Sequence, residues 1–341
     1  MAIANLAISE PVRRVLLRAV QASALPPAYL FVGPSGVGKR ATALALAQSL
    51  NCLTPGEDAC DRCAACQRIE KLVHPDIHLL EPQGQVIKID QIRHLQESLS
   101  LQAYDARVKV AILDDATKLT VEAANSLLKM LEEPPDHTLF VLVCQNLGGL
   151  PATVLSRTQI VRFGLLPHDQ IVALLRRQRP PQVDAERLAA LSGGRPGKAL
   201  GIEVSRVLEM RSQVLELLQQ AQAGDTSLLL ASAEQWAKRK GDHDLLFELL
   251  LSLARDLTIL SAGGSTPLLM HADIQLALTS LAAGLSTPSS GELFEIVHAI
   301  QLAMTHNANP QLAFEVMLLK IGGVYERARQ RDRERQQYSF A

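Results

Sequence analysis

Four of the five cysteines lie close together in the sequence, in the order C-x7-C-x2-C-x2-C. They are Cys52, Cys60, Cys63 and Cys66. Four thiolates can close a tetrahedral shell around Zn²⁺ that leaves no position for water, which is typical of structural zinc and not of catalytic zinc. In a chain of 341 residues this spacing indicates metal ligands and not a disulfide framework. The alternative is four free thiols on a loop and a helix. The fifth cysteine, Cys144, is expected in the core.

A glycine-rich segment, Gly33-Pro34-Ser35-Gly36-Val37-Gly38-Lys39, follows a predicted strand and opens a predicted helix. This is the G-x4-G-K phosphate loop, in which backbone N–H groups turn toward phosphate oxygens and the lysine adds a positive charge. The next residue is normally Ser or Thr, whose hydroxyl binds Mg²⁺, but here it is Arg40, which has no lone pair and repels the cation. Thr42 cannot replace it, because two residues along a helix is about 200° around the axis. The segment predicts a phosphate cradle without its metal ligand.

Two acids, Asp114 and Asp115, end an apolar strand in the segment KVAILDDA. An acid at this place is the second element of a nucleotide site, where the first acid holds Mg²⁺. The second acid is usually Glu, which orients the attacking water. Asp115 is one methylene shorter, and a displacement of about 1 Å can lower a rate ~100-fold. The alternative for the pair is a helix cap and a solvated charge.

The first half of the chain alternates short apolar runs with amphipathic helical stretches, which predicts a parallel sheet flanked by helices and can position these motifs. The predicted strands are Ala28–Val32, Ile77–Leu80, Lys109–Leu113, Leu139–Cys144 and Gln159–Arg162. The predicted helices are Glu10–Gln21, Lys39–Leu50, Asp90–Leu101 and Val121–Glu132, the last ending before two prolines.

Strand signals disappear after Phe163–Pro167, and the rest of the chain is predicted to be helical. Short helices over Asp169–Arg177 and Ala185–Leu191 precede a glycine-rich break, and longer helices run from about Arg206 to Arg335. Asn309-Pro310 is a good helix start, with Asn as the cap and Pro in the first turn. The fold class is therefore α/β followed by all-α.

Composition excludes several classes of protein. With 48% hydrophobic and 20% charged residues the chain can bury large cores, so a disordered protein is excluded. No apolar run reaches the ~18 residues of a membrane-spanning helix, and the N-terminal residues do not have the pattern of a secretory signal. A net charge of −1 and 4% aromatic residues argue against a chain that binds nucleic acid by itself. Contact with DNA is expected to be local or made with partners.

Several segments resemble the clamp-loader branch of the AAA+ ATPases, whose bacterial members are part of the DNA polymerase III holoenzyme. They are GPSGVGK, the cysteine insert, ILDDATKLTVEAANSLLKMLEEPP, LPATVLSRT and NANPQLAFEVMLLK. The resemblance covers nearly the whole chain. It implies an AAA+ domain over 1–166 with a zinc module near 50–70, a helical lid over 167–205 and a helical collar over 206–341. It also implies a cytoplasmic clamp-loader subunit whose partners are the gamma/tau and delta subunits, the sliding clamp and, through the assembled complex, primed DNA.

Departures from the family pattern concern ATP hydrolysis. The hydrolysing motor subunits keep Thr after the loop lysine, Asp-Glu at the strand end and an arginine in the lid motif G-x-x-R-[DE]-A-L. Here Gly197 occupies the arginine position. The resemblance therefore implies a subunit that hydrolyses little or no ATP and anchors the ring, and it leaves open whether ATP or ADP binds at Gly33, Gly36, Gly38, Lys39 and Asp114. The alternatives are a gamma/tau-like motor subunit and an unrelated phosphate-loop kinase, for which the helical C-terminal half offers no acceptor site.

The segment Ser156-Arg157 carries the last implied role. In the clamp loaders that the chain resembles, the corresponding arginine faces a neighbour's ATP, which implies that Arg157 acts in trans as an arginine finger. The alternative is a surface arginine paired with a nearby acid. The histidines His74 and His78 have no nucleophile beside them in sequence and are expected to be structural.

Overall fold

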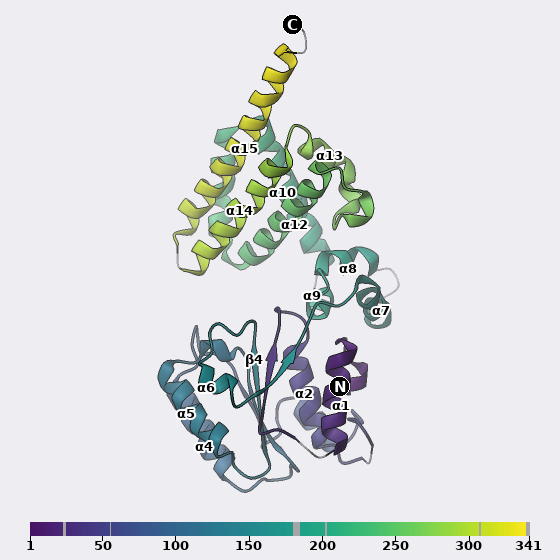
Figure 1. Ribbon diagram of the computed structural model, residues 1–341, viewed down its shortest axis with the longest axis vertical. Helices are drawn as coiled ribbons and strands as arrows, with labels where there is room; N and C mark the ends of the chain where they lie inside the picture. Colours follow the sequence, from purple (N-terminus) through teal and green to yellow (C-terminus); the bar gives the residue numbers. More distant parts are fainter. Residues whose placement is uncertain (23–24, 55, 180–184, 202, 307, 339–341) are drawn as a thin grey trace. The chain divides into compact units, whose positions relative to one another are not determined.

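The computed structural model describes residues 1–22, 25–54, 56–179, 185–201, 203–306 and 308–338. The chain divides into two compact units, which are described separately (Figure 1). The first unit is Met1–Ala185 with Ser192–Gly201, and the second is Glu186–Leu191 with Ile202–Ala341. The predicted lid over 167–205 is shared between the units, and its residues 180–184 and 202 lie outside the described part. The division into AAA+ domain, lid and collar stays a prediction.

The first unit is built on a five-stranded sheet in which every pair of neighbouring strands is parallel. The strand order is β2-β3-β4-β1-β5. The strands are β1 (Ala28–Val32), β2 (Ile77–Leu80), β3 (Lys109–Leu113), β4 (Thr138–Cys144) and β5 (Gln159–Arg162). Every residue of β1 and β3 is buried, as expected for central strands of a sheet that is covered on both faces. The predicted fold class and all five predicted strands are confirmed, with β4 beginning one residue earlier than predicted.

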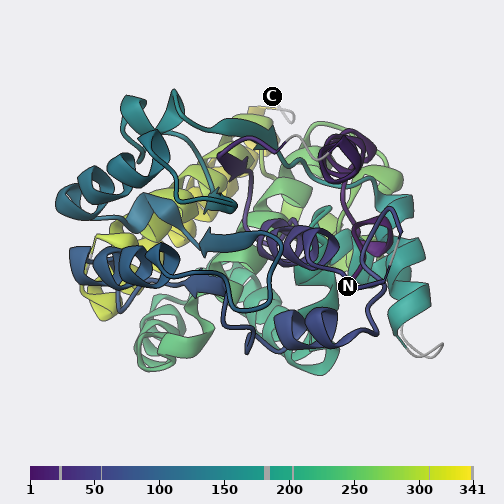
Figure 2. The same cartoon turned by 90° about the horizontal axis from the view of Figure 1, so that it is seen from below.

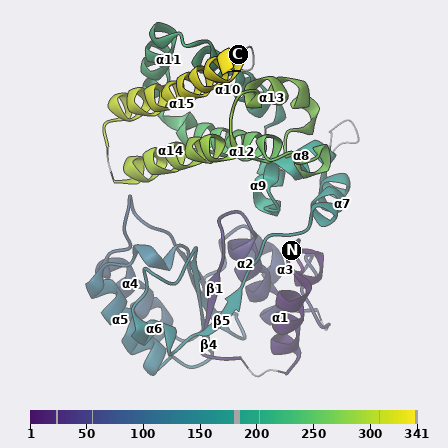
Figure 3. The ribbon, with the colours of Figure 1, turned by 45° about the horizontal axis from the view of Figure 1, so that its top comes forward.

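Helices cover both faces of this sheet (Figures 2 and 3). One face packs against the 3₁₀ turn η1 (Ile3–Asn5), α1 (Glu10–Ala22) and α2 (Lys39–Leu50), and the other against α4 (Ile89–Ser100), α5 (Val121–Glu132) and α6 (Ala152–Leu155). Between α2 and β2 lies α3 (Ala64–Glu70), and η2 (Ala116–Lys118) follows β3. The helices α7 (His168–Gln178) and α9 (Pro196–Gly201) complete the unit.

The described part of the second unit contains helices and no strand, after α8 (Ala185–Ser192) at the boundary. The α-helices that follow are α10 (Val204–Ala223), α11 (Thr226–Lys238), α12 (His243–Ser261), α13 (Gln275–Ala282), α14 (Thr287–Thr305) and α15 (Pro310–Tyr338). Its 3₁₀ turns are η3 (Lys240–Asp242), η4 (Thr266–Leu268) and η5 (Ala272–Ile274).

In the core of the second unit, the buried rings of Phe247 on α12 and Phe314 on α15 stack with centroids 5.6 Å apart. The predicted start of α15 is confirmed, because the Asn309 side chain accepts from the amides of Gln311 and Leu312. Among the described helices, none combines the length and the apolar character needed to cross a lipid bilayer.

Candidate functional site

The predicted phosphate loop connects β1 to α2, and three of its glycines are needed for its shape. Gly36 and Gly38 have φ of 79° and 91°, a left-handed backbone that side chains disfavour. At Gly33 the reason is space, because a Cβ there would lie 2.2 Å from the carbonyl oxygen of Phe163. The loop thus has the strand–loop–helix setting that its sequence predicts.

Lys39 is folded into this loop and is only 7% exposed. Its Nζ donates to the carbonyl oxygens of Gly33 and Pro34, at 2.6 and 2.7 Å. Burial lowers the pKa of Lys39, while the nearby Cys144 and Asp114 act in the opposite direction. The lysine therefore lies at the loop, beside the place where a phosphate group would bind.

Arg40 turns its guanidinium toward the acid at the end of β3. Its Nη1 lies 3.4 Å from Asp114 Oδ2 and also forms an ion pair with Glu81. The hydroxyl of Thr42 donates to the Gly38 carbonyl oxygen at 2.8 Å and is fully buried, so it serves the helix backbone. The carboxylate that the motif would offer to Mg²⁺ is thus paired with an arginine of the same chain.

A cavity of about 460 Å³ joins these groups. Its lining includes the phosphate loop, both acids that follow β3, and Cys144, Gln145 and Gly197. The amide of Gly197 donates to the Gly36 carbonyl oxygen at 2.8 Å. The residue that replaces the arginine of the family motif therefore contacts the phosphate loop through its backbone. The sequence interpretation assigned Cys144 to the core and missed Gln145. Cys144 is buried, burial raises its pKa to about 11, and it also borders the cavity.

Asp115 departs from the usual geometry of the second acid. Its φ of 60° is left-handed, which costs a non-glycine residue roughly 1–2 kcal/mol, although aspartate tolerates it better than most. Its Oδ1 accepts from the hydroxyl of Thr117 at 2.5 Å. The left-handed backbone of Asp115 could not be predicted from the sequence.

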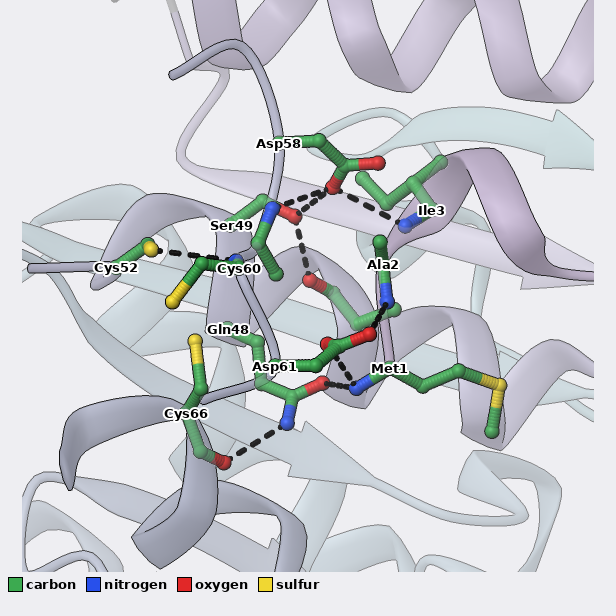
Figure 4. Close-up of polar contacts among 12 residues, drawn as sticks. Met1, Ala2, Ile3, Gln48, Ser49, Cys52, Asp58, Cys60, Asp61 and Cys66 are labelled. Carbon is green, nitrogen blue, oxygen red and sulfur yellow. Dashed lines mark hydrogen bonds and ion pairs between the residues drawn. The ribbon is translucent and has the colours of Figure 1, made fainter. Parts of the chain in front are cut away.

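The four clustered cysteines come together in space. Their Sγ atoms all lie within 4.8 Å of one another, with Cys52 and Cys66 buried and Cys60 and Cys63 half-buried. Three of them are labelled in Figure 4. Zn–S bonds of 2.3 Å in a tetrahedron place sulfur atoms about 3.8 Å apart, so a small inward movement would close the shell. The four thiols fit a closed site for a thiolate-binding metal such as zinc.

Backbone and hydroxyl donors surround three of these sulfurs. Backbone amides of Cys60, Cys63 and Cys66 donate to the preceding cysteine sulfurs at 3.3 to 3.5 Å. The Thr54 hydroxyl, followed by two backbone amides, lowers the pKa of Cys60 to about 5, whereas burial raises the pKa of Cys66. The donors therefore favour the thiolate form at Cys60, whereas burial favours the thiol form at Cys66.

Arg157 follows α6 and precedes β5, in the position that its motif predicts. Its Nη2 lies 2.6 Å from Glu132 Oε1 at the end of α5, and its Nη1 donates to the Thr153 carbonyl oxygen at 3.1 Å. The side chain is 35% exposed. In the isolated chain Arg157 thus forms a surface ion pair with an acid, which is the alternative that the sequence left open. A role in trans would require a neighbouring subunit and stays a prediction.

Comparisons with known proteins converge on one family. A family model described as "DNA polymerase III, delta subunit" matches residues 8–166. The chain is 34% identical over 264 residues to the DNA polymerase III subunit delta' of Bacillus subtilis, which covers 76% of this chain and 79% of that protein. It is 38% identical over 194 residues to the DNA polymerase III subunit delta' of Pseudomonas aeruginosa, which covers 55% and 59%.

One solved structure extends the comparison to the fold. A DNA polymerase III gamma subunit-related protein from Thermotoga maritima matches with a TM-score of 0.55 and 19% identity, over 92% of this chain and 99% of that one. At this identity the match shows a shared fold and nothing about activity.

Proposed function

Since the chain belongs to the family of DNA polymerase III delta' subunits of the clamp loader, we propose that it hydrolyses little or no ATP itself and supplies Arg157 to a neighbour's ATP site. It would anchor the ring while the sliding clamp is loaded onto primed DNA. The gamma/tau and delta subunits would be its partners, held through the helices α10 to α15. DNA would be reached through the assembled complex, in keeping with a net charge of −1.

The ion pair between Arg40 and Asp114 is the main support for the proposal that the chain hydrolyses little or no ATP. Mg²⁺ would have to displace a guanidinium from the carboxylate, and it would find no hydroxyl at the position after Lys39. The second acid is shortened, and Gly197 stands where the motor subunits have an arginine. With three hydrolysis elements altered together, we expect the phosphate cradle to be able to bind nucleotide without turning it over.

The chemistry of Arg157 supports the proposed role at a neighbour's ATP site. Guanidinium is always charged and presents a planar fork of donors, which suits the charge that builds up on a transferred phosphoryl group. Its pair with Glu132 is on the surface, where such pairs contribute roughly 0–1 kcal/mol, so exchanging Glu132 for a neighbour's phosphate costs little. A subunit whose own site is inactive can in this way contribute to catalysis next door.

Cys52, Cys60, Cys63 and Cys66 would hold a structural zinc. A closed shell of four thiolates has no position for water, so the metal would supply cross-linking of the loop to α3 and no chemistry on a substrate. Within the clamp loader the zinc module would be a stability element of the first unit.

Reconstitution tests the proposal. The purified chain should join a complex with gamma/tau and delta subunits, hydrolyse no ATP alone, and be required for DNA-stimulated hydrolysis by the complex. Turnover by the isolated chain at the rate of a full clamp loader would favour the gamma/tau-like motor subunit instead. Failure to co-purify with any clamp-loader subunit would contradict both.

A further inference from the structure

Two carboxylates of the cysteine loop, defined here as residues 51–54 and 56–63, bind backbone amides near the start of the chain (Figure 4). The two oxygens of Asp58 accept from the amides of Ile3 and Ala4, at 3.1 and 2.8 Å. One oxygen of Asp61 accepts from the amide of Ala2 at 3.0 Å. The turn η1 has no side-chain cap from the residue that precedes it. The loop therefore satisfies three successive amides that the start of a helical turn leaves without partners.

The same loop is tied to the end of α2 and to an apolar cluster. The Ser49 hydroxyl donates to Asp58 at 2.6 Å, and the Gln48 amide donates to the Cys66 carbonyl oxygen at 2.8 Å. Ala2, Cys52, Ala59 and Cys66 form one buried cluster, with Cys60 and Cys63 packed against it. The residues that would bind a metal and the residues that hold Ala2 are thus parts of one packed structure.

The other end of this segment lies at the phosphate loop. Ile3 and Ile8 are buried in the core between the sheet and α2. A Cβ built on Gly38 would have Ile8 Cγ2 and the Ala7 carbonyl oxygen as its nearest neighbours, at 3.7 and 3.9 Å. Residues 2–8 therefore run along α2, about 18 Å for its 12 residues, from the cysteine loop to the phosphate loop.

We propose, building on the structural zinc of the proposed function, that Asp58 and Asp61 are positioning residues. Through them, metal binding at the four cysteines orders residues 2–8, which pack against the phosphate loop at Gly38. Asp58 lies in sequence between the first two ligands and Asp61 between the second and third. Without a metal, weak N–H···S hydrogen bonds at 3.3 to 3.5 Å close this loop. With the thiolates bound to one ion, both carboxylates are held where the three amides need them.

Hydrogen exchange on the full-length chain tests the coupling. The protein is loaded with Zn²⁺, and a second sample is stripped with a chelator under reducing conditions. Stripping should speed exchange of the amides of Ile3 and Ala4 roughly 5- to 150-fold, the usual range for coupled sites. It should also speed exchange around Gly38, whereas amides of α5 on the opposite face of the sheet should keep their rates. If stripping loosens the cysteine loop alone and residues 2–8 keep their protection, the proposal is wrong.

Asp58→Ala separates positioning from metal ligation. The variant should still bind one Zn²⁺ per chain, yet show fast exchange at Ile3 and Ala4 with zinc bound. Because coupling is reciprocal, its affinity for Zn²⁺ in competition with a chelator should fall by a similar factor. Glu57→Ala is the matched control, since it removes one exposed negative charge from the same loop and should change neither quantity. Fast exchange in Asp58→Ala with unchanged zinc affinity would overturn the coupling.

Discussion

Arg40 Nη1 lies 3.4 Å from Asp114 Oδ2, so the acid at the end of β3 meets a cation that is part of its own chain. Glu81 is the second acid on the same guanidinium. In a hydrolysing phosphate-loop protein the corresponding acid holds Mg²⁺. The substitution of Arg for Ser or Thr thus removes one metal ligand and neutralises another.

Nucleotide binding should therefore be insensitive to Mg²⁺. We expect the chain to bind ADP equally in EDTA and in Mg²⁺, and Arg40→Thr to gain about tenfold in affinity, or 1.4 kcal/mol, when Mg²⁺ is added. The variant frees Asp114 and supplies the missing hydroxyl. Calorimetric titration measures both affinities, with Arg93→Thr on the exposed surface of α4 as the control. An Mg²⁺ dependence in the unaltered chain would contradict the prediction.

Metal analysis tests the cysteine site. Purified protein should carry about one Zn²⁺ per chain. Cys63→Ser should lose the metal, because it removes one of the four thiolate ligands. The Cys63 sulfur also caps α3 by accepting from the Cys66 amide. Circular dichroism should show that the sheet and the second unit stay folded. Cys144→Ser, outside the cluster, should keep the metal, and loss of zinc from this variant would count against the assignment of the four ligands.

Arg157→Ala tests the arginine finger. The variant should fold and enter the complex, yet lower DNA-stimulated hydrolysis at the neighbouring site by up to ~10³–10⁵, the effect of such fingers in other phosphoryl-transfer systems. Arg162→Ala, which removes an exposed positive charge from β5, is the control and should leave the rate unchanged. If a reconstituted loader with Arg157→Ala hydrolyses ATP at the rate of the unaltered complex, Arg157 is not an arginine finger.

The ion pair of Arg157 gives a second, separable measurement. Glu132→Gln breaks the pair that the single chain makes, and we expect it to change the free energy of unfolding by less than about 1 kcal/mol. It should not slow hydrolysis in the complex, since the arginine would have left Glu132 there. A large loss of activity in Glu132→Gln would mean that the pair itself is needed.

Most of the fold could be predicted from local sequence patterns. Strands such as Lys109–Leu113 are short apolar runs with clear ends, and Val121–Glu132 is closed by a side-chain cap at Thr120 and by two prolines. The helix Ala64–Glu70 was not predicted as a separate element. It is only 7 residues long, which is too short for a clear helical periodicity in the sequence.

The side-chain contacts that define the site could not be predicted from local sequence patterns. The type of residue at Arg40 excluded a metal ligand, but its partner Glu81 is 41 residues away and carries no motif. Asp58 lies inside the cysteine insert and holds amides 54 and 55 residues earlier. Motifs identify residue types that face a ligand. Pairings between surface side chains depend on how distant loops fold together, which one sequence does not encode by spacing.

His74 illustrates a structural histidine with a measurable consequence. It is 3% exposed, and its Nδ1 accepts from the Asp76 amide at 3.3 Å, which requires the neutral ring. Burial and then the charge of Arg68 hold its pKa below the usual 6.5, although Asp76 and Asp105 act in the opposite direction. The unfolded chain therefore takes up the proton first as the pH falls.

Folding stability should for this reason be highest above pH 6.5 and decrease as the pH falls from there through the lower pKa of the folded state. His74→Asn should remove part of this decrease, because the Asn side chain keeps an acceptor for the amide two residues on and does not titrate. Urea unfolding at pH 7.5 and pH 5.5 measures the change for both proteins. His94→Asn, on a side chain that is 80% exposed, should leave the pH dependence as it is. Because the pKa of the half-buried His78 is also lowered, chiefly by burial, some slope should persist in His74→Asn. An unchanged slope in that variant would show that His74 is not the group that titrates.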